Sequence, residues 1–169
     1  MNNIIGYSLI IPYFNEGEII CLTLEEYSNA LNEINCNYEI IIVDDGSSLK
    51  AKNFINNFKS EYLLIEHKKN RGYGSSISTG ISYSKYKNII ITDSDNTYPA
   101  QGLRKMISSY QENNPCMVIA SREGRNARIP LLRRPAKYFL RKLASFLCSY
   151  EIRDLNSGLR IFRKNFYKK

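Results

Sequence analysis

Residues 38–47 read Tyr-Glu-Ile-Ile-Ile-Val-Asp-Asp-Gly-Ser, a run of apolar and mostly β-branched side chains that ends in two carboxylates. Continuous apolar runs of this kind are typical of strands that are covered on both faces, as in a parallel sheet. Similar runs occur at residues 7–13, 62–66, 88–92 and 116–120. We therefore predict five strands, with residues 38–43 as the second.

Helical patterns separate these strands. Apolar residues recur at helical spacing over residues 20–34 and 103–110, and shorter helices are expected at 53–58 and 75–83. This order predicts an α/β fold, with a Rossmann-like, mostly parallel sheet and helices on both faces. A further helix, over about residues 135–150, has one apolar and one basic face. Both core helices and helices that lie on an anionic membrane have this pattern.

Composition narrows the class of protein. The chain has 169 residues, of which 43% are hydrophobic and 24% charged, as expected for one folded domain. It contains neither a membrane-spanning apolar stretch nor a secretion signal, so we expect it to fold on the cytoplasmic side.

Its four cysteines form no C-x-x-C pair, which argues against a zinc site or a disulfide framework. The one histidine, His67, is expected to be an exposed residue after the third strand.

The net charge of +8 is distributed unevenly. Residues 1–120 contain 10 basic and 13 acidic side chains, whereas residues 121–169 contain 14 and 3. The basic C-terminal third favours phosphates, an anionic lipid surface or nucleic acid, and composition does not choose between them. Because no nucleic-acid recognition motif is present, we expect no nucleic-acid partner.

Polar residues follow three of the predicted strands. The first strand runs into residues 12–16, the second ends at 44–47 and the fourth at 93–96. Ligands of an open parallel sheet bind beyond these carboxyl ends, and carboxylates gathered there need a cation or hydrogen-bond donors. Asp93 and Asp95 are two residues apart, so both can face one side and offer hard oxygen ligands to Mg²⁺ or Mn²⁺. An Asp-x-Asp motif alone is a weak signal of a metal site, because turns and helix caps use the same residues.

Two common phosphate-binding motifs are absent. The chain has no P-loop sequence, and Gly72-Tyr73-Gly74 is followed by Ile77 where a dinucleotide fingerprint has its third glycine. We instead expect Gly72 to let the N-terminus of a helix approach a ligand, with Arg71 beside it.

Together these segments resemble the catalytic domain of glycosyltransferase family 2, which has the GT-A fold. The matching stretches are Ile-Ile-Pro-Tyr-Phe-Asn-Glu at 10–16, Val-Asp-Asp-Gly-Ser at 43–47, Asn-Arg-Gly-Tyr-Gly at 70–74 and Thr-Asp-Ser-Asp at 92–95. Ser121-Arg122 and the stretch 154–160 are similar to the branch that uses dolichyl or polyprenyl phosphate. The resemblance implies a single catalytic domain over 1–169. Residues 1–120 would be its nucleotide-sugar-binding half, and 121–169 a basic, acceptor-side and membrane-proximal segment.

The resemblance also implies roles for individual residues on the donor side. Asp45, with Asp44 as a second candidate, would read the edge of the base. Asp93 would face the ribose and diphosphate, and Asp95 would ligate the metal, with Asp93 as its companion. The remaining candidates for the donor pocket are Pro12, Tyr13, Phe14, Glu16, Arg71, Gly72 and Ser94.

On the acceptor side, Arg122, Arg134 and Arg160 are candidates for gripping the acceptor phosphate or the departing diphosphate. The implied reaction is a single displacement, with inversion, from a UDP- or GDP-linked sugar. The Glu-Asp base pair of many hydroxyl-using relatives is absent, and Asp154 is the candidate carboxylate in this segment. A polyprenyl-phosphate acceptor, which is already anionic, is therefore favoured.

Two departures from the family pattern matter. Thr97 stands where some branches place a metal-binding Gln, and the sequence stops where the family's catalytic domains continue. We therefore expect a C-terminally truncated domain, peripheral on the inner face of the membrane, whose missing part carries acceptor groups or an anchor. The alternatives are a family 2 transferase that acts on a polysaccharide or glycan hydroxyl, and a shortened module that binds nucleotide without turnover. Nucleotidyltransferase and phospho-receiver domains lack support, because their motifs after the first strand are absent.

Overall fold

The computed structural model describes residues 5–34, 36–120 and 157–167. The chain divides into two compact units, Met1–Ile119 with Gly158–Lys169, and Ala120–Ser157. Apart from Ala120 and Ser157, the described residues belong to the first unit. The expected helix over 135–150 lies outside the described residues, as do Arg122, Arg134 and Asp154.

All five predicted strands and four predicted helices between them are present, with ends that differ by a few residues. The strands are β1 (Gly6–Tyr13), β2 (Asn37–Asp44), β3 (Leu63–Glu66), β4 (Asn88–Ile91), β5 (Met117–Ile119) and β6 (Arg160–Arg163). The helices are α1 (Ile19–Ile34), α2 (Lys52–Ile55), α3 (Tyr73–Tyr83) and α4 (Leu103–Asn113), with short 3₁₀ turns at Ala100–Gly102 and Lys164–Phe166.

The strands form one six-stranded sheet in the order β3-β2-β1-β4-β6-β5. Strand β1 pairs in parallel with β2 and β4, and β2 pairs in parallel with β3. Strand β6 was not predicted, and it runs antiparallel between β4 and β5. Its sequence, Arg-Ile-Phe-Arg, is too short to give a strand signal by itself. The sheet is therefore mostly parallel, as predicted, with one antiparallel insertion from the basic C-terminal third.

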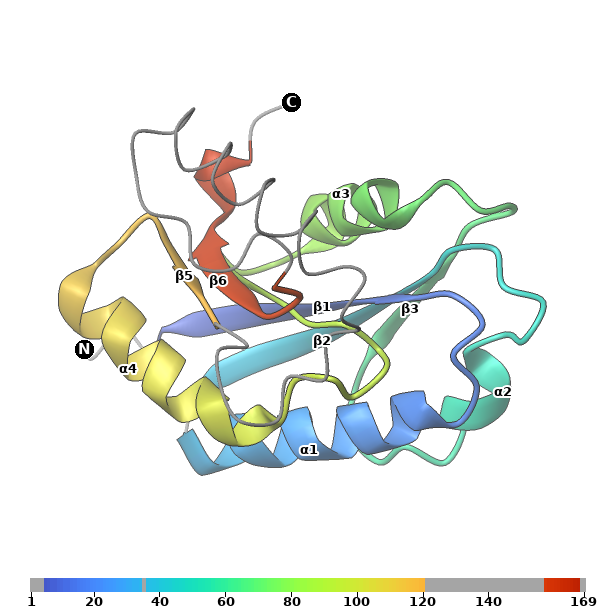
Figure 1. Cartoon of the computed structure of the whole chain (residues 1–169), viewed down its shortest axis with the longest axis horizontal. Coiled ribbons are helices and arrows are strands. Elements are labelled where there is room, and N and C mark those ends of the chain that lie inside the picture. Colours follow the sequence, from blue (N-terminus) through green and yellow to red (C-terminus); the bar gives the residue numbers. More distant parts are fainter. Residues whose placement is uncertain (1–4, 35, 121–156, 168–169) are drawn as a thin grey trace, which may run out of the picture. The chain divides into compact units, whose positions relative to one another are not determined.

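Helices cover both faces of the sheet, with α3 on one side and α1 and α4 on the other (Figure 1). Strand residues alternate between these two layers. Ile10, Ile41 and Ile89 pack with Ile77 and Ile81 of α3 in one buried cluster. The expected coverage of both faces fails at the two edge strands, where Leu63 in β3 and Met117 and Ile119 in β5 are exposed. Helix α3 packs against the central strands β1 and β2, whereas α4 packs against β5 and β6. In the described part of the chain, no helix is long and apolar enough to span a bilayer.

The loop after β2 lies directly against the loop after β3. Gly46 has a φ of +74°, and a Cβ placed on it would overlap the backbone of Lys69. Gly17, in the loop after β1, has a similar φ of +67° but no atom within 4 Å of its Cβ position. The two glycines therefore share a left-handed conformation and differ in their surroundings.

This difference gives a direct test. Gly17→Ala should lower the free energy of unfolding by about 1 kcal/mol, because the methyl group disfavours the left-handed backbone. Gly46→Ala should lower it by more than about 2 kcal/mol, because the same strain is joined by overlap with Lys69. Urea denaturation of both variants measures the difference. Equal losses in the two variants would contradict the close contact between the loops.

Candidate functional site

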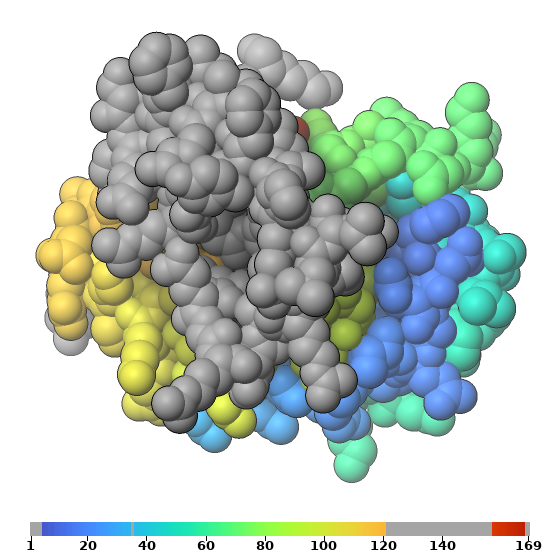
Figure 2. All heavy atoms as spheres, viewed as in Figure 1, coloured from blue at the N-terminus to red at the C-terminus, as the bar shows by residue number. Residues whose placement is uncertain are grey.

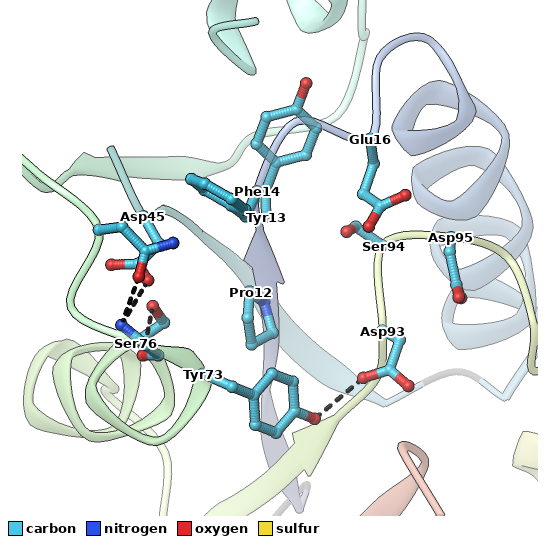
Figure 3. Close-up of a pocket in the computed structure, with 12 residues that line it drawn as sticks. Pro12, Tyr13, Phe14, Glu16, Asp45, Tyr73, Ser76, Asp93, Ser94 and Asp95 are labelled. Carbon is cyan, nitrogen blue, oxygen red and sulfur yellow. Dashed lines mark hydrogen bonds between the residues drawn. The ribbon is translucent and has the colours of Figure 1, made fainter. Parts of the chain in front are cut away.

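A cavity of about 270 Å³ opens beyond the carboxyl ends of β1, β2 and β4 (Figure 3). Figure 2 shows atoms of the segment that follows β1 (blue) and of the green region that includes α3 on the same face of the molecule. The cavity brings together residues that the sequence places far apart. Its lining is formed by Pro12, Tyr13, Phe14, Glu16, Asp45, Asn70, Gly72, Tyr73, Ser76, Asp93, Ser94 and Asp95.

Nine of these lining residues are among the predicted site residues. Three predicted residues, Asp44, Arg71 and Arg160, are described but do not line the cavity. Three lining residues were missed, namely Asn70, Tyr73 and Ser76. Gly72 directly precedes α3 and Ser76 is four residues further on, so helical spacing from Gly72 is a signal that could have identified Ser76.

The loop after β1 forms one wall and is tied to the loop after β2. Tyr13 is buried, and its hydroxyl donates to the carbonyl of Leu49 at 2.8 Å. The backbone N–H of Asn15, whose φ is +58°, donates to Ser47 Oγ at 3.1 Å. Phe14 lies on the rim with 44% of its surface exposed. This leaves an aromatic face open to a ligand on an otherwise rigid loop.

The two adjacent carboxylates after β2 have different environments. Asp44 is fully buried and accepts hydrogen bonds from the backbone N–H groups of Ser47 (2.8 Å) and Ala51 (3.0 Å), so it shapes its own loop. Asp45 lines the cavity and accepts hydrogen bonds from the backbone N–H groups of Arg71 and Gly72. The expectation for His67 was wrong, because it is buried beside Asp45 with only 6% of its surface exposed.

The N-terminus of α3 faces the cavity, with Gly72, Tyr73 and Ser76 in its lining. Gly72, at a φ of +90°, is the residue before the first turn, and its carbonyl accepts from the backbone N–H groups of Ser75 and Ser76. The side chain of Arg71 is exposed outside the lining. This segment therefore offers a ligand its backbone groups and the side chains of Tyr73 and Ser76.

The loop after β4 carries the Asp-x-Asp pair. Tyr73 donates from its hydroxyl to Asp93 Oδ1 at 2.9 Å, which spans the cavity from α3 to the β4 side (Figure 3). Asp95 is exposed, and its Oδ1 accepts from the backbone N–H of Thr97 at 3.0 Å. Helix α1 supports this loop, because Thr23 Oγ1 donates to the carbonyl of Ser94 at 3.1 Å. The carboxylates are thus presented by a braced turn.

The residues before β6 complete the surroundings of Asp93. Gly158 donates its backbone N–H to the hydroxyl of Tyr98 at 2.6 Å. A Cβ on Gly158 would overlap the Asp93 carboxylate, so only glycine at position 158 leaves room for that carboxylate. Burial, together with Asp93, raises the pKa of Tyr73, while the positive charge of Arg160 acts in the opposite direction. Arg160 is therefore close enough to influence this group electrostatically, although it does not line the cavity.

Negative charge is concentrated on the β4 side of the cavity. Burial raises the pKa of Glu16, and the neighbouring charges of Asp95 and Asp93 raise it further. Within the described residues, no group of three or more His, Cys, Asp or Glu side chains is arranged to hold a metal ion. Two carboxylates with a third close by are nevertheless oxygen donors of the kind that a hard divalent cation shares with water and phosphate. The residues present therefore fit such an ion as partial ligands.

Comparison with known proteins identifies the family to which the chain belongs. The model of "Glycosyl transferase family 2" matches residues 8–169. A dolichyl-phosphate beta-glucosyltransferase of Trichomonas vaginalis is 28% identical, over 95% of this chain and 54% of the relative. A dodecaprenyl-phosphate galacturonate synthase of Rhizobium johnstonii is 22% identical, over 95% of this chain and 48% of the relative. The chain thus spans about half the length of these relatives.

Solved structures give the same picture of the fold. Mannosyl-3-phosphoglycerate synthase from Rubrobacter xylanophilus superimposes with a TM-score of 0.74 at 13% identity, over 96% of this chain and 54% of that one. A mannosyltransferase from Pyrobaculum calidifontis, in complex with GDP-Man and Mn²⁺, has a TM-score of 0.60 at 18% identity, over 93% of this chain and 44% of that one. At these identities the likeness concerns the fold, and it confirms the expected GT-A-type α/β architecture.

The crowding of carboxylates can be measured directly. Asp95→Asn should lower the pKa of Glu16 toward the ordinary glutamate range, because one negative neighbour is removed while burial remains. NMR titration of the Glu side-chain carboxyl carbons measures the pKa in both proteins. Glu112→Gln, an exposed change in α4, serves as the control and should leave the pKa of Glu16 unaltered. An unchanged Glu16 in Asp95→Asn would contradict the electrostatic coupling.

Proposed function

The chain belongs to glycosyltransferase family 2, and we propose that it transfers a sugar from a UDP- or GDP-linked donor to a polyprenyl phosphate, with inversion at the anomeric carbon. The observation that carries the donor half of this proposal is the cavity itself. It combines an aromatic rim, the N-terminus of a helix and the Asp93–Asp95 pair beyond the carboxyl ends of β1, β2 and β4. Sheets of this type bind ligands at that edge.

The donor would lie across this cavity with its parts matched to the walls. Pro12, Tyr13 and Phe14 supply an apolar surface for the nucleoside. The backbone at Gly72 and the first turn of α3 favour the negative charge of the diphosphate. Asp45 remains our candidate for the base edge, and its carboxylate already accepts two backbone hydrogen bonds that fix where it points. The carboxylate of Asp44 accepts hydrogen bonds from backbone N–H groups of its own loop, so Asp44 is the weaker candidate.

Asp93 and Asp95 are the proposed ligands of Mg²⁺ or Mn²⁺, and Glu16 is close enough to strengthen their field. A bound divalent ion would supply charge stabilisation for the departing diphosphate. Tyr73 and Gly158 hold the Asp93 carboxylate in place from two sides. Thr97 contributes its backbone N–H to Asp95, so this residue positions a proposed ligand even though its side chain is not the Gln of other branches.

The acceptor half rests on the relatives and on charge. Two relatives are named for dolichyl-phosphate and dodecaprenyl-phosphate chemistry. A phosphate oxygen is anionic near neutral pH, so it can attack the anomeric carbon without a strong general base. Arg122, Arg134 and Arg160 are the proposed phosphate-binding cations, and Asp154, which precedes Arg160 in the same stretch 154–160, is the proposed carboxylate of this segment. The positive charge of residues 121–169 would also favour binding of the enzyme to the inner face of an anionic membrane.

The donor and metal assignments predict a specific loss in Asp95→Ala. With Mn²⁺, either UDP or GDP at about 100 times its Kd should stabilise the unaltered chain by about 2.7 kcal/mol, and EDTA should remove that gain. Asp95→Ala should fold normally, because the side chain is exposed, but should lose the metal-dependent gain. Thermal unfolding with each nucleotide, with Mn²⁺ or EDTA, is the measurement.

Glu25→Ala is the matched control, since it removes an exposed carboxylate from α1. It should retain the full effect of nucleotide and Mn²⁺. Metal-dependent binding that survives in Asp95→Ala would remove Asp95 from the metal site. If neither nucleotide stabilises the unaltered chain, the donor assignment itself fails.

The acceptor is tested by release of nucleoside diphosphate from UDP-glucose, UDP-GlcNAc and GDP-mannose. Vesicles that contain undecaprenyl phosphate should stimulate release from one donor, and vesicles without it should not, because the lipid phosphate is the attacking group. Stimulation by soluble glycans instead would favour the polysaccharide alternative. Nucleotide binding without release from any donor would favour a binding module.

A further inference from the structure

The single histidine of the chain lies inside the wall of the cavity and has no part in the proposed reaction. His67 directly follows β3, and its backbone N–H donates to the carbonyl of Asp44 at 2.8 Å. Its side chain is buried between β2 and α3. Nδ1 lies 2.6 Å from Asp45 Oδ1, and Nε2 lies 3.0 Å from Thr79 Oγ1 of α3. One imidazole thus connects two elements that border the cavity.

Asp45 is the centre of this arrangement. Its Oδ1 accepts from His67 and from the backbone N–H of Arg71 at 2.9 Å, and its Oδ2 accepts from the backbone N–H of Gly72 at 2.7 Å. Burial by itself would raise the pKa of Asp45, but the hydrogen bonds from His67, Arg71 and Gly72 outweigh it and hold the pKa below its usual value. The group is therefore a carboxylate at neutral pH.

The charge of Asp45 determines which nitrogen of His67 carries the hydrogen. A carboxylate has no hydrogen to donate, so Nδ1 must be the donor to Asp45. In the neutral imidazole Nε2 is then an acceptor, and the hydroxyl of Thr79 can donate to it. Both ring nitrogens have matched partners, so the ring has one orientation and one favoured tautomer.

We infer that His67 is a positioning residue for the donor-binding wall: it orients Asp45, which in turn holds the backbone of Arg71 and Gly72 and fixes the start of α3 at the cavity. Asn70, Gly72 and Tyr73 all lie on the segment held in this way and line the cavity. Tyr73 in turn reaches Asp93. A buried imidazole on one side of the cavity therefore supports the proposed metal ligand on the other.

The inference rests on the proposed function for the identity of the ligand, and the hydrogen-bonded arrangement is testable without any ligand. His67→Leu removes the donor to Asp45 at similar volume. His67→Asn keeps an N–H donor near the position of Nδ1. Tyr83→Phe, an exposed change at the far end of α3, is the control. The ¹⁵N shifts of the one imidazole in the unaltered chain report its tautomer.

Four results are expected. The imidazole carries its hydrogen on Nδ1. In His67→Leu, the amides of Arg71 and Gly72 exchange with solvent about tenfold faster or more, beyond any change shared with the β1 amides. Metal-dependent affinity for UDP or GDP, whichever the unaltered chain binds, falls about tenfold or more. His67→Asn recovers much of both effects, which a purely space-filling role for the ring would not produce.

Other outcomes separate the two proposals. Hydrogen on Nε2 alone, or exchange at Arg71 and Gly72 that follows the rest of the protein, overturns the positioning role. Faster exchange with undiminished nucleotide affinity also overturns it, because the loop would then not matter to the ligand. If the unaltered chain binds neither nucleotide while the exchange result holds, the proposed donor is wrong and the hydrogen-bonded support stands. If His67→Leu does not fold, the positioning role is tested by the tautomer of His67 in the unaltered chain and by the amide exchange and nucleotide affinity of His67→Asn.

Discussion

The parallel pairing of β1 with both β2 and β4 is the constraint on which the rest of the structure depends. It directs three strands the same way, so the polar residues that follow each of them meet at one edge of the sheet. Carboxylates gathered at one edge repel one another unless donors or cations compensate. The cavity is the region where this requirement is met.

The surroundings of the acidic residues at this edge differ from one residue to the next. Asp44 is satisfied by amides of its own loop, whereas Asp45 is shared among His67, Arg71 and Gly72. Asp93 has the hydroxyl of Tyr73, and Glu16 has neighbours of its own sign that raise its pKa. The carboxylates with the fewest hydrogen-bond donors thus lie on the β4 side of the cavity. A cation bound there would find the carboxylates after β2 already hydrogen-bonded within the protein.

Sequence alone predicted the parallel core from local patterns, and its resemblance to glycosyltransferase family 2 implied nine of the lining residues. Apolar runs identify the strands, and topology carries the residues after them to one edge. It did not predict β6, His67 or Tyr73. Strand β6 is four residues long and owes its place to its neighbours β4 and β5. The burial of His67 and the reach of Tyr73 depend on how loops far apart in sequence pack together, which no local pattern contains. The roles of Arg122, Arg134 and Asp154 stay predictions, since these residues lie outside the described ones.

The placement of Gly158 and β6 has a consequence for how the protein is made. The ribosome releases β1, β2, β3 and β4 in order, and each new parallel strand finds its partner already present. The outer edge of β4, however, has no partner until residues 160–163 emerge, about seventy residues later. Throughout that interval an apolar strand edge is open to pairing with other chains, and Asp93 lacks the backbone that later packs against it. The site to which residues 12–95 contribute is therefore complete only once residues 158–163 have been added.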